Sequence, residues 1–354
     1  MIWPRITWAG RGHRIIAKGL TLFGLSAACL MGMGGAARAG GTCQMQELGE
    51  IPLHDEAGRL TLDAEINGRP VRMLLDTGSS ETVLTRAGAG DLGLRTVPLN
   101  YNIEFYGVGG RDGATSVVVN EFKLGGLIAH KIHMFVTGLH AFGDAVGLVG
   151  ARFLLESDVE FDVPESKLRL FKPQSCSGDQ VVYWGGAYSV APMTSSYTQQ
   201  DIEVTVRVNG TLVTALMDTG ADTSVLTLDA AARAGVTPKS PGVTGDSPSV
   251  GMGREEEPTF VGVFPSFAFG DETIKNAKLQ FADLFRADKE NNTLNTHIAH
   301  QVVPYQMLLG ADFFRSHRVY VSQSQRKVYV SYIGGPVFQT AQTPKAPPAA
   351  TATK

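Results

Sequence analysis

Two aspartates in matching surroundings are the residues of this chain best suited to chemistry. Asp76 and Asp218 each follow three apolar residues and precede Thr and Gly, in the stretches LLDTGSS and LMDTGAD. A carboxylate at the end of an apolar strand is costly to bury unless another group pairs with it or shares its proton. Two such carboxylates held close together share one proton, and they can act on a water molecule as general base and general acid.

The two aspartates belong to an internal repeat. Residues 60–94 and 202–236 align without a gap at an offset of 142 positions, so that Asn-Gly, Asp-Thr-Gly and Val-Leu coincide in the two copies. Alternating apolar and polar residues predict a strand, Asn-Gly predicts a hairpin turn, and a second strand then ends at the aspartate. The chain therefore contains two copies of one lobe, and Asp218 is the expected partner of Asp76.

Further signals recur in both copies in the same order. Thr85 and Thr227 can cap short helices over residues 86–93 and 228–235. Gly-rich tips follow in strand-like surroundings at 105–113 and 250–256. Each copy then closes with an apolar-apolar-Gly block, at Gly150 and at Gly310, and with a pair of strands at 158–171 and 318–330.

This doubled order of motifs resembles the aspartic proteases, in particular the retroviral-like (retropepsin-like) group, as a single chain with both lobes fused. The resemblance covers about residues 53–333. It implies a mostly β, bilobal acid-protease fold, in which two homologous β-barrel-like lobes enclose the active-site cleft. The first copy is similar to the first lobe of pepsin-type enzymes, whose flap carries Tyr-Gly, and the second copy is similar to retroviral protease.

The resemblance also implies roles for individual residues. Asp76 and Asp218 would be catalytic, and the loops around them would be supported by Thr77, Gly78, Ser79, Thr219, Gly220 and Ala221. The threonines would lock the two loops by mutual hydrogen bonds, and the glycines would let backbone amides approach the carboxylates. Flap and substrate-binding positions would be Tyr106, Gly107, Gly109, Gly110, Gly251, Gly253 and Asp222, and the packing glycines would be Gly150 and Gly310.

Ser79 and Ala221 occupy equivalent positions but differ in one hydroxyl group. By resemblance to pepsin-type enzymes, the Ser79 hydroxyl can donate a hydrogen bond to Asp76. Such a donor favours the charged form of a carboxylate and lowers its pKa. We therefore expect the ionised form to be biased toward Asp76 and the shared proton toward Asp218, within a pair that titrates as a unit.

The two ends of the chain differ in composition from the lobes. Residues 1–39 combine a cationic start, an apolar stretch of 14 residues and a small-x-small site, which predicts a signal peptide cleaved after Ala39. The apolar stretch is short for a membrane span of about 20 residues; an uncleaved anchor and a lipoprotein site at Cys29 are the alternatives. Residues 339–354, mostly Pro, Ala and Thr, are expected to be a disordered tail.

The remaining boundaries follow from the repeat. Residues 40–172 form the N-terminal lobe, 173–200 an inter-lobe linker, and 201–338 the C-terminal lobe. The linker is either a plain tether or a source of edge strands for a sheet between the lobes. A polar stretch at 284–306 is interpreted as an insertion loop near the substrate cleft.

Export would place the cysteines where they can form a disulfide. After cleavage at Ala39 two remain, Cys43 and Cys176, in a periplasmic or extracellular compartment where disulfides persist. They flank the first lobe, so a disulfide would close it. Two free thiols are the alternative.

Other kinds of chemistry find little support. A formal charge of -3 shows no basic excess of the kind that binds nucleic acid. His130 and His133, and His297 and His300, have the spacing of metal ligands but no adjacent third ligand, so no metal and no cofactor are expected. The GVGGRDG stretch lacks the Lys-Ser/Thr ending of a phosphate loop, and Ser79 lacks His and Asp partners for a serine hydrolase.

The sequence therefore predicts an exported aspartic endopeptidase that hydrolyses polypeptides through a water held between Asp76 and Asp218. The alternative is a pseudo-protease, a peptide-binding module with little or no turnover. The in-line duplication makes a dimer unnecessary, so the protein is expected to be a monomer without a stable membrane anchor.

Overall fold

The computed structural model describes most of the two lobes. The described residues are 7–8, 43–56, 58–99, 103–108, 110–138, 143–194, 201–249, 256–284 and 305–338. The expected signal peptide, apart from a two-residue strand β1 (Thr7–Trp8), and the expected tail lie outside them. So do most of the expected insertion loop, Gly109, Gly251, Gly253, His297 and His300.

The first lobe is a closed barrel of six strands. Around the barrel they are β3 (Arg59–Ile66), β4 (Arg69–Leu75), β10 (Ala145–Val149), β5 (Val83–Leu84), β9 (Leu127–Val136) and β8 (Thr115–Leu124), which pairs with β3. Asn67 and Gly68 join β3 to β4 with φ of 51° and 77°, the left-handed conformation that the predicted hairpin turn requires. Asp76 follows directly where β4 ends.

The second lobe repeats this construction. Its barrel is formed by β14 (Glu203–Val208), β15 (Thr211–Met217), β20 (Met307–Leu309), β16 (Val225–Thr227), β19 (Glu272–Ala282) and β18 (Glu257–Phe269), which closes onto β14; β17 (Thr244–Ser249) extends from β18. Asn209 and Gly210 again have positive φ, 49° and 80°. The predicted mostly β fold with two β-barrel lobes is confirmed.

Short helices follow the same pattern in both lobes. The helices α1 (Arg86–Asp91) and α3 (Leu228–Arg233) begin after Thr85 and Thr227, whose hydroxyl groups accept hydrogen bonds from the amides of Gly88 and Ala230. These are the two caps that the sequence predicts. Two further helices, α2 (Ala151–Leu154) and α5 (Ala311–Ser316), follow Gly150 and Gly310.

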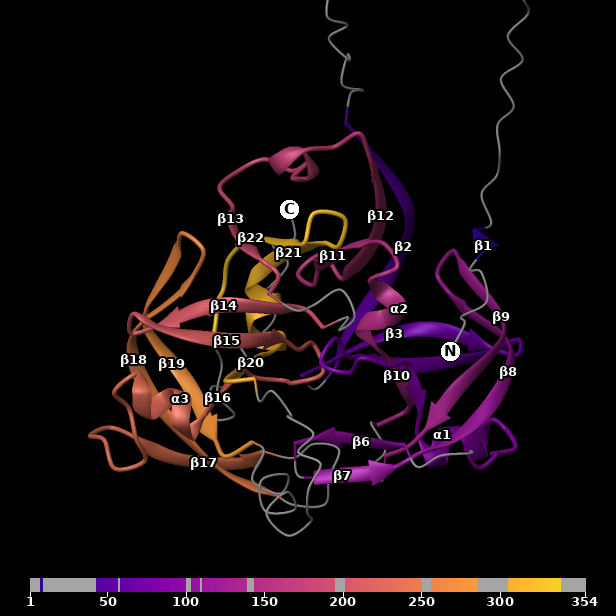
Figure 1. Ribbon diagram of the computed structural model, residues 1–354, viewed down its shortest axis with the longest axis horizontal. Coiled ribbons are helices and arrows are strands. Elements are labelled where there is room, and N and C mark those ends of the chain that lie inside the picture. The colour runs from indigo at the N-terminus through magenta and orange to yellow at the C-terminus, as the bar shows by residue number, and fades with distance from the viewer. Residues whose placement is uncertain are drawn as a thin grey trace, which may run out of the picture.

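A third sheet, which we call the central sheet, joins the lobes. Its order is β2 (Gln44–Glu56), β12 (Lys167–Gln174), β11 (Asp158–Asp162), β21 (His317–Ser322), β22 (Lys327–Tyr332) and β13 (Ser189–Pro192), and it lies between and above the two barrels in Figure 1. The strands β11 and β21 come from different lobes and pair antiparallel, with Glu160 opposite Tyr320. These two residues occupy equivalent positions in the repeat, so a pseudo-two-fold axis passes between them.

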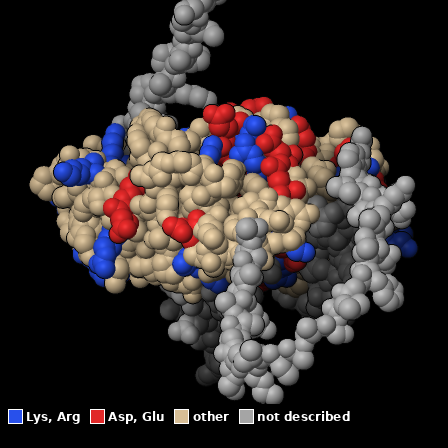
Figure 2. All heavy atoms as spheres, turned by 90° about the horizontal axis from the view of Figure 1, so that it is seen from above, with Lys and Arg blue, Asp and Glu red and all other residues tan. Residues whose placement is uncertain are grey.

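The surface carries charges of both signs. On the face seen in Figure 2, Lys and Arg lie among Asp and Glu, and wide uncharged areas separate them. This agrees with a formal net charge close to zero, -3 for the whole chain.

The segment between the lobes covers one face of the central sheet. Residues 176–188, which we call the strap, include a 3-10 turn η1 (Gly178–Val181) and lead into β13. Val181 and Trp184 of the strap pack with Phe171, Tyr320 and Tyr329 of the sheet. The segment is therefore an integral part of the lobe junction.

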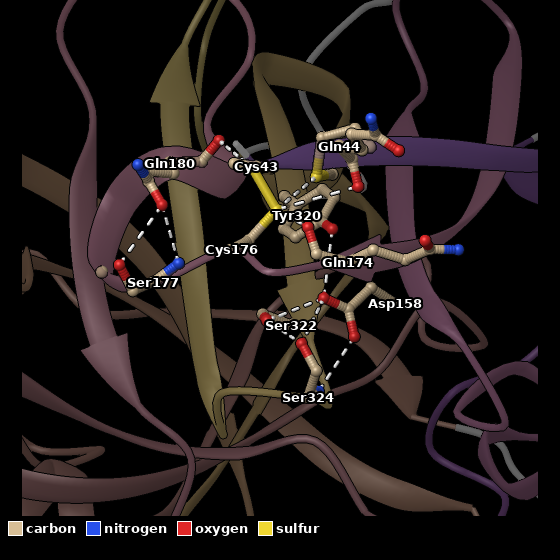
Figure 3. Close-up of a disulfide and its surroundings, with 12 residues drawn as sticks. Cys43, Gln44, Asp158, Gln174, Cys176, Ser177, Gln180, Tyr320, Ser322 and Ser324 are labelled. Carbon is tan, nitrogen blue, oxygen red and sulfur yellow. Dashed lines mark hydrogen bonds between the residues drawn. A yellow bond between two sulfur atoms is a disulfide. The ribbon is translucent and has the colours of Figure 1, made fainter. Parts of the chain in front are cut away.

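A disulfide fastens the strap. Cys43 and Cys176 are bonded, which ties the start of β2 to the start of the strap (Figure 3). Close by, the buried carboxylate of Asp158 accepts hydrogen bonds from the hydroxyls of Ser322 and Ser324, at 2.8 and 2.9 Å. The expected disulfide is therefore present, and it stands at the lobe junction as well as at the ends of the first lobe.

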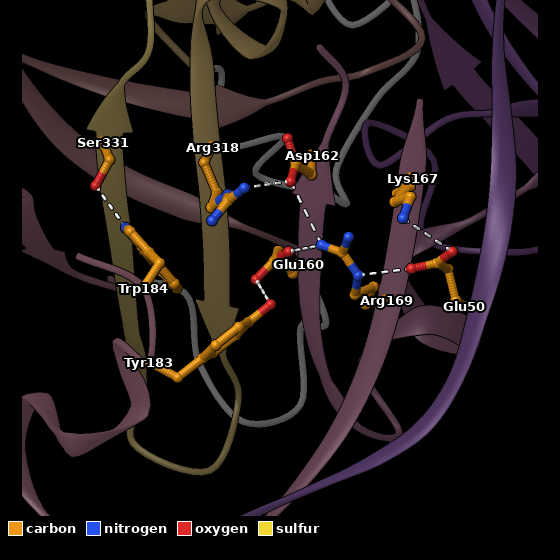
Figure 4. Close-up of polar contacts among 9 residues, drawn as sticks. All are labelled: Glu50, Glu160, Asp162, Lys167, Arg169, Tyr183, Trp184, Arg318 and Ser331. Atoms are coloured by element: carbon orange, nitrogen blue, oxygen red, sulfur yellow. Dashed lines mark hydrogen bonds and ion pairs between the residues drawn. The ribbon is translucent and has the colours of Figure 1, made fainter. Parts of the chain in front are cut away.

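A network of charged groups centred on two buried carboxylates contacts the strap (Figure 4). Glu160 and Asp162 of β11 are fully buried; Arg169 contacts both carboxylates, and Arg318 of the second lobe donates to Asp162 at 2.6 Å. The Tyr183 hydroxyl of the strap donates to Glu160 at 2.6 Å. This network connects both lobes and the strap.

We expect reduction of the disulfide to destabilise the protein. The bond joins residues 133 positions apart, so its loss frees a long loop in the unfolded chain and should cost about 2–4 kcal/mol. Urea unfolding with and without reductant would measure this. A Cys43→Ser/Cys176→Ser variant should unfold at the reduced midpoint in both conditions, and an unchanged wild-type midpoint on reduction would contradict the expectation.

Candidate active site

The two aspartates stand at equivalent strand ends. The amide of Asp76 donates to the carbonyl of Val149 at 3.1 Å, and the amide of Asp218 donates to that of Leu309 at 2.9 Å. The hydrogen bond of Asp76 thus continues the pairing of β4 with β10, which ends before Gly150. That of Asp218 continues the pairing of β15 with β20, which ends before Gly310. Both carboxyl groups are partly buried, and they form a hydrogen bond with each other.

The neighbouring threonines bind the two loops to each other. The Thr77 amide donates to Oγ1 of Thr219 and the Thr219 amide donates to Oγ1 of Thr77, both at 3.0 Å. Each hydroxyl then donates to the opposite lobe, from Thr77 to the Met217 carbonyl at 2.7 Å and from Thr219 to the Leu75 carbonyl at 2.9 Å. Both threonines are buried. The structure thus contains the mutual lock that the resemblance implied.

The glycines allow each loop to lie against the opposite carboxyl group. A Cβ atom placed on Gly78 would lie 2.4 Å from Cγ of Asp218, and one on Gly220 would lie 2.5 Å from Cγ of Asp76. Gly150 and Gly310 lie beneath the loops, where a Cβ would come within 2.3 Å of the Glu81 carbonyl oxygen and 2.5 Å of the Thr223 carbonyl carbon. Any side chain at these positions would push the two aspartates apart.

Hydroxyl groups support both packing glycines. In the first lobe the Gly150 amide donates to Oγ1 of Thr82 at 3.1 Å, and in the second the Gly310 amide donates to Oγ of Ser224 at 2.9 Å. Ser224 donates in turn to the buried carboxylate of Asp312 at 2.6 Å. Burial raises the pKa of Asp312 to about 6, against the opposing effect of these hydrogen bonds.

The carboxyl groups accept different numbers of amide hydrogen bonds. Oδ1 of Asp218 accepts from Gly220 and Ala221, at 2.9 and 3.2 Å, whereas Oδ1 of Asp76 accepts from Ser79 at 3.0 Å. The Ser79 hydroxyl donates to the Glu81 carbonyl at 2.9 Å. The predicted hydrogen bond from the Ser79 hydroxyl to Asp76 is therefore wrong. The hydroxyl donates to a backbone carbonyl, and the backbone amide of Ser79 donates to Asp76.

The pKa shifts of the pair favour the shared proton on Asp76. Burial and the charge of Asp218 raise the pKa of Asp76 to about 8. Burial also raises the pKa of Asp218, but two amide donors and the hydrogen bond from Asp76 stabilise its ionised form. The sequence favoured the opposite distribution, because it assigned to Asp76 a hydroxyl donor that the Ser79 side chain does not supply.

Two equivalent apolar surfaces flank the pair. Side chains alternate along a strand, so Leu74 points to the same side as Asp76, outside the barrel that buries Met73 and Leu75. Leu74 packs with Val83 and Leu148, and we call this cluster the N-wall. Its counterpart in the second lobe, the C-wall, consists of Leu216, Val225, Ala282, Leu284 and Leu308.

One hairpin of the first lobe reaches both walls. The strands β6 (Glu104–Gly107) and β7 (Gly110–Gly113) form the predicted flap, with Tyr106 opposite Arg111 and Gly107 opposite Gly110. Phe105 packs on the N-wall and Val108 packs on the C-wall. The flap therefore bridges the two lobes beside the aspartates.

The base of the flap is anchored by charge. Asp112 on β7 pairs with Arg86 at 2.7 Å and accepts hydrogen bonds from the Thr137 hydroxyl and the Gly138 amide. Arg86 also donates to the Gly113 carbonyl at 2.9 Å. These partners lower the pKa of Asp112 and hold it ionised, although partial burial acts in the other direction.

Several residues of this site were not found from the sequence. Phe105 and Val108 lie within the predicted flap, but only the fold shows which wall each one contacts. Gln280 links the Asp218 loop to β17, because it accepts from the Thr223 hydroxyl at 2.7 Å and donates to Asp246 at 2.9 Å. An uncharged polar residue within the buried end of a strand was the available signal.

Asp222 lies to one side of the dyad. Its side chain is exposed, and its Oδ2 would be 3.3 Å from a Cβ placed on Gly58 of the first lobe. His130 and His133 are exposed on β9, where His130 pairs with Glu121. Within the described ranges, no three His, Cys, Asp or Glu residues are grouped as metal ligands. In the same ranges, no helix has the length and apolar character of a membrane span.

Two β-barrels that bring paired Asp-Thr-Gly loops together define the aspartic protease class of fold. A comparison with known protein families matches the aspartyl protease family twice, over residues 62–153 and 204–313. The chain belongs to this family, in its retropepsin-like group, with both lobes in one chain. No curated protein matches the chain.

The raised pKa of Asp76 predicts how stability changes with pH. Its folded pKa of about 8 exceeds the unfolded value of about 4, so the folded protein binds more protons between these values and its stability falls as pH rises. Asp76→Asn removes this titration while keeping the shape. We expect the variant to gain melting temperature over wild type progressively from about pH 5 to about pH 8. Parallel melting curves across this range would contradict the assignment.

Gly78→Ala should separate the two loops. Its methyl group would collide with the carboxyl of Asp218, and overpacking of this kind costs about 1–3 kcal/mol. Urea unfolding would measure the loss. Gly90→Ala is the matched control, because a Cβ there, in α1, meets nothing within 4 Å and alanine favours a helix. Equal stability of the two variants would mean that the contact at Gly78 is unimportant.

Proposed function

We propose that the protein is an aspartic endopeptidase that hydrolyses peptide bonds of polypeptides. The observation that carries this proposal is the reciprocal threonine lock, which brings the carboxyl groups of Asp76 and Asp218, both with raised pKa values, into one hydrogen-bonded pair. A carboxyl and a carboxylate side by side supply an acid and a base at the same point.

The two aspartates have different roles in the proposed reaction. Asp218 takes a proton from a water molecule, whose oxygen attacks the peptide carbonyl carbon, and Asp76 gives its proton to the carbonyl oxygen. Asp76 then takes a hydroxyl proton from the tetrahedral intermediate and Asp218 gives its proton to the nitrogen. The C–N bond breaks to leave an acid and an amine, and the pair regains its starting protonation. No bond forms between enzyme and substrate.

The walls and the flap suggest how a substrate is held. Apolar side chains on either side of the scissile bond would contact the N-wall and the C-wall, and main-chain groups would pair with the flap. To admit a peptide, Val108 must leave the C-wall. Closure of the flap afterwards would exclude water other than the attacking one.

The proposed setting is outside the cytoplasm. The disulfide between Cys43 and Cys176 favours an oxidising compartment. Together with the predicted signal peptide it supports export to the periplasm or the medium. Because the dyad forms within one chain, we propose that a monomer is sufficient for activity.

The test is cleavage of a diverse peptide mixture by the mature protein over a range of acidic to neutral pH. We expect wild type to generate new fragments, and Asp76→Asn and Asp218→Asn each to generate none, because each removes one of the two proton-transfer groups. Mass spectrometry would identify the fragments. Identical fragment lists from wild type and variants would refute the proposal.

Two further outcomes separate the alternatives. Peptides that bind to wild type without being cut would favour a pseudo-protease. Activity that reappears when the two inactive variants are mixed would favour dyads formed between chains.

A further inference from the structure

Arg315 connects the second catalytic loop to the opposite lobe. It lies in α5, five residues after Gly310. Its Nε and Nη2 donate to the two carboxylate oxygens of Asp55, at 2.8 and 3.3 Å, and Nη2 also donates to the Gly58 carbonyl. Its Nη1 donates to the Asp222 carbonyl at 3.1 Å. Asp55 and Gly58 belong to the first lobe, where β2 turns into β3.

The Asp222 carbonyl lies at the end of the loop that begins with Asp218. In that loop the amides of Gly220 and Ala221 donate to Asp218, and the Ala221 carbonyl accepts from the Ala311 amide at 2.8 Å. The α5 helix therefore fixes the loop at two successive carbonyls, one through its first amide and one through Arg315. The second of these attachments continues across the lobe boundary to Asp55.

The first lobe has no equivalent connection at this position. Leu155 is the residue that corresponds to Arg315 in the repeat. The cation of α2 is Arg152, which pairs with Glu81 of its own lobe at 2.6 Å. The loop of Asp218 is thus tied to the opposite lobe by a charged side chain, whereas at the equivalent position the loop of Asp76 is not.

We propose that Arg315 is a positioning residue, which uses the first lobe to hold the amides of the Asp218 loop on the ionised carboxylate. The guanidinium is well suited to this, since its planar fork binds a carboxylate and two carbonyls at once. The side chain is 18% exposed and the carboxylate of Asp55 is 31% exposed, so the pair is largely shielded from water. The proposal rests on the proposed proteolytic function.

The expected consequence concerns the pH profile. Two amide donors favour the ionised form of Asp218. If the loop relaxes, these donors move away and the pKa of Asp218 rises, so the acidic limb of the pH–rate profile moves to higher pH. A loop that is merely less stable would lower the folded fraction without moving this limb.

The experiment compares Arg315→Gln with wild type in the peptide assay. We expect kcat to fall about tenfold with KM within about twofold, because the misplaced group acts on the chemical step. The apparent pKa of the acidic limb should rise by about half a pH unit. Arg315→Lys can pair with Asp55 but lacks the planar guanidinium, so its kcat should lie between those of wild type and Arg315→Gln. The combination of Asp55→Asn with Arg315→Gln should be no worse than Arg315→Gln alone.

Lys123→Gln is the matched control for the loss of a cation. Lys123 pairs with Glu65 and Glu121 on the outside of the first barrel, away from both loops. We expect wild-type kinetics from this variant. Arg315→Gln with unchanged kcat and an unchanged acidic limb would overturn the proposal, and so would a loss confined to KM.

Hydrogen exchange gives a readout that does not depend on turnover. In Arg315→Gln, peptides covering residues 216–224 should exchange faster than in wild type, while the rest of the second barrel should be unchanged. Unaltered exchange in these peptides would overturn the proposal. A wild-type protein that cleaves nothing would overturn the proposed function instead, and the exchange data alone would then decide the role of Arg315.

Discussion

The reciprocal hydrogen bonds between Thr77 and Thr219 are the interaction on which the remaining structure of the site depends. Each of the two hydroxyls donates to the opposite lobe and accepts from an amide of that lobe, so neither loop has a complete set of partners alone. Each neutral bond of this kind contributes only about 0.5–1.5 kcal/mol, but all four are buried, and a group left unpaired there would cost more. The lock therefore holds the two carboxyl groups close together against their mutual repulsion, which is relieved when they share a proton.

A lock of this kind needs two lobes that return to the same relative position. The central sheet provides this, because β11 and β21 pair across the pseudo-two-fold axis. The buried network of Glu160, Asp162, Arg169 and Arg318 lies on the same strands and their neighbours. Buried ion pairs add little net stability after desolvation, but removing one partner leaves a charge unpaired. For this reason we interpret the network as a determinant of lobe register, which the strap and its disulfide then cover.

How much of this could be predicted differs from feature to feature. Local signals were sufficient for the hairpins at Asn67 and Asn209 and for the helix caps at Thr85 and Thr227, since each depends on residues only a few positions apart. The repeat was sufficient to pair Asp76 with Asp218. The partner of the Ser79 hydroxyl was not predictable, because it depends on where the loop places a backbone carbonyl. The contacts of Phe105 and Val108 were not predictable either, since they join segments about 20 to 200 positions apart in sequence through the fold.

The duplicated lobes have become unequal at the positions that surround the pair. Phe135 packs on the N-wall beside Val83, whereas the equivalent position beside Val225 carries Gln280, which binds Thr223 and Asp246. The flap that contacts both walls comes from the first lobe, and so does Asp76, whose pKa is raised to about 8 by burial and by the charge of Asp218. Asp218 belongs to the second lobe, whose loop has the additional amide donor and the contact from Arg315. A dimer of identical chains would carry the same contacts on both subunits. Fusion into one chain allows each lobe to keep its own set, so that the flap comes from one side and the additional amide donor and the Arg315 contact come from the other.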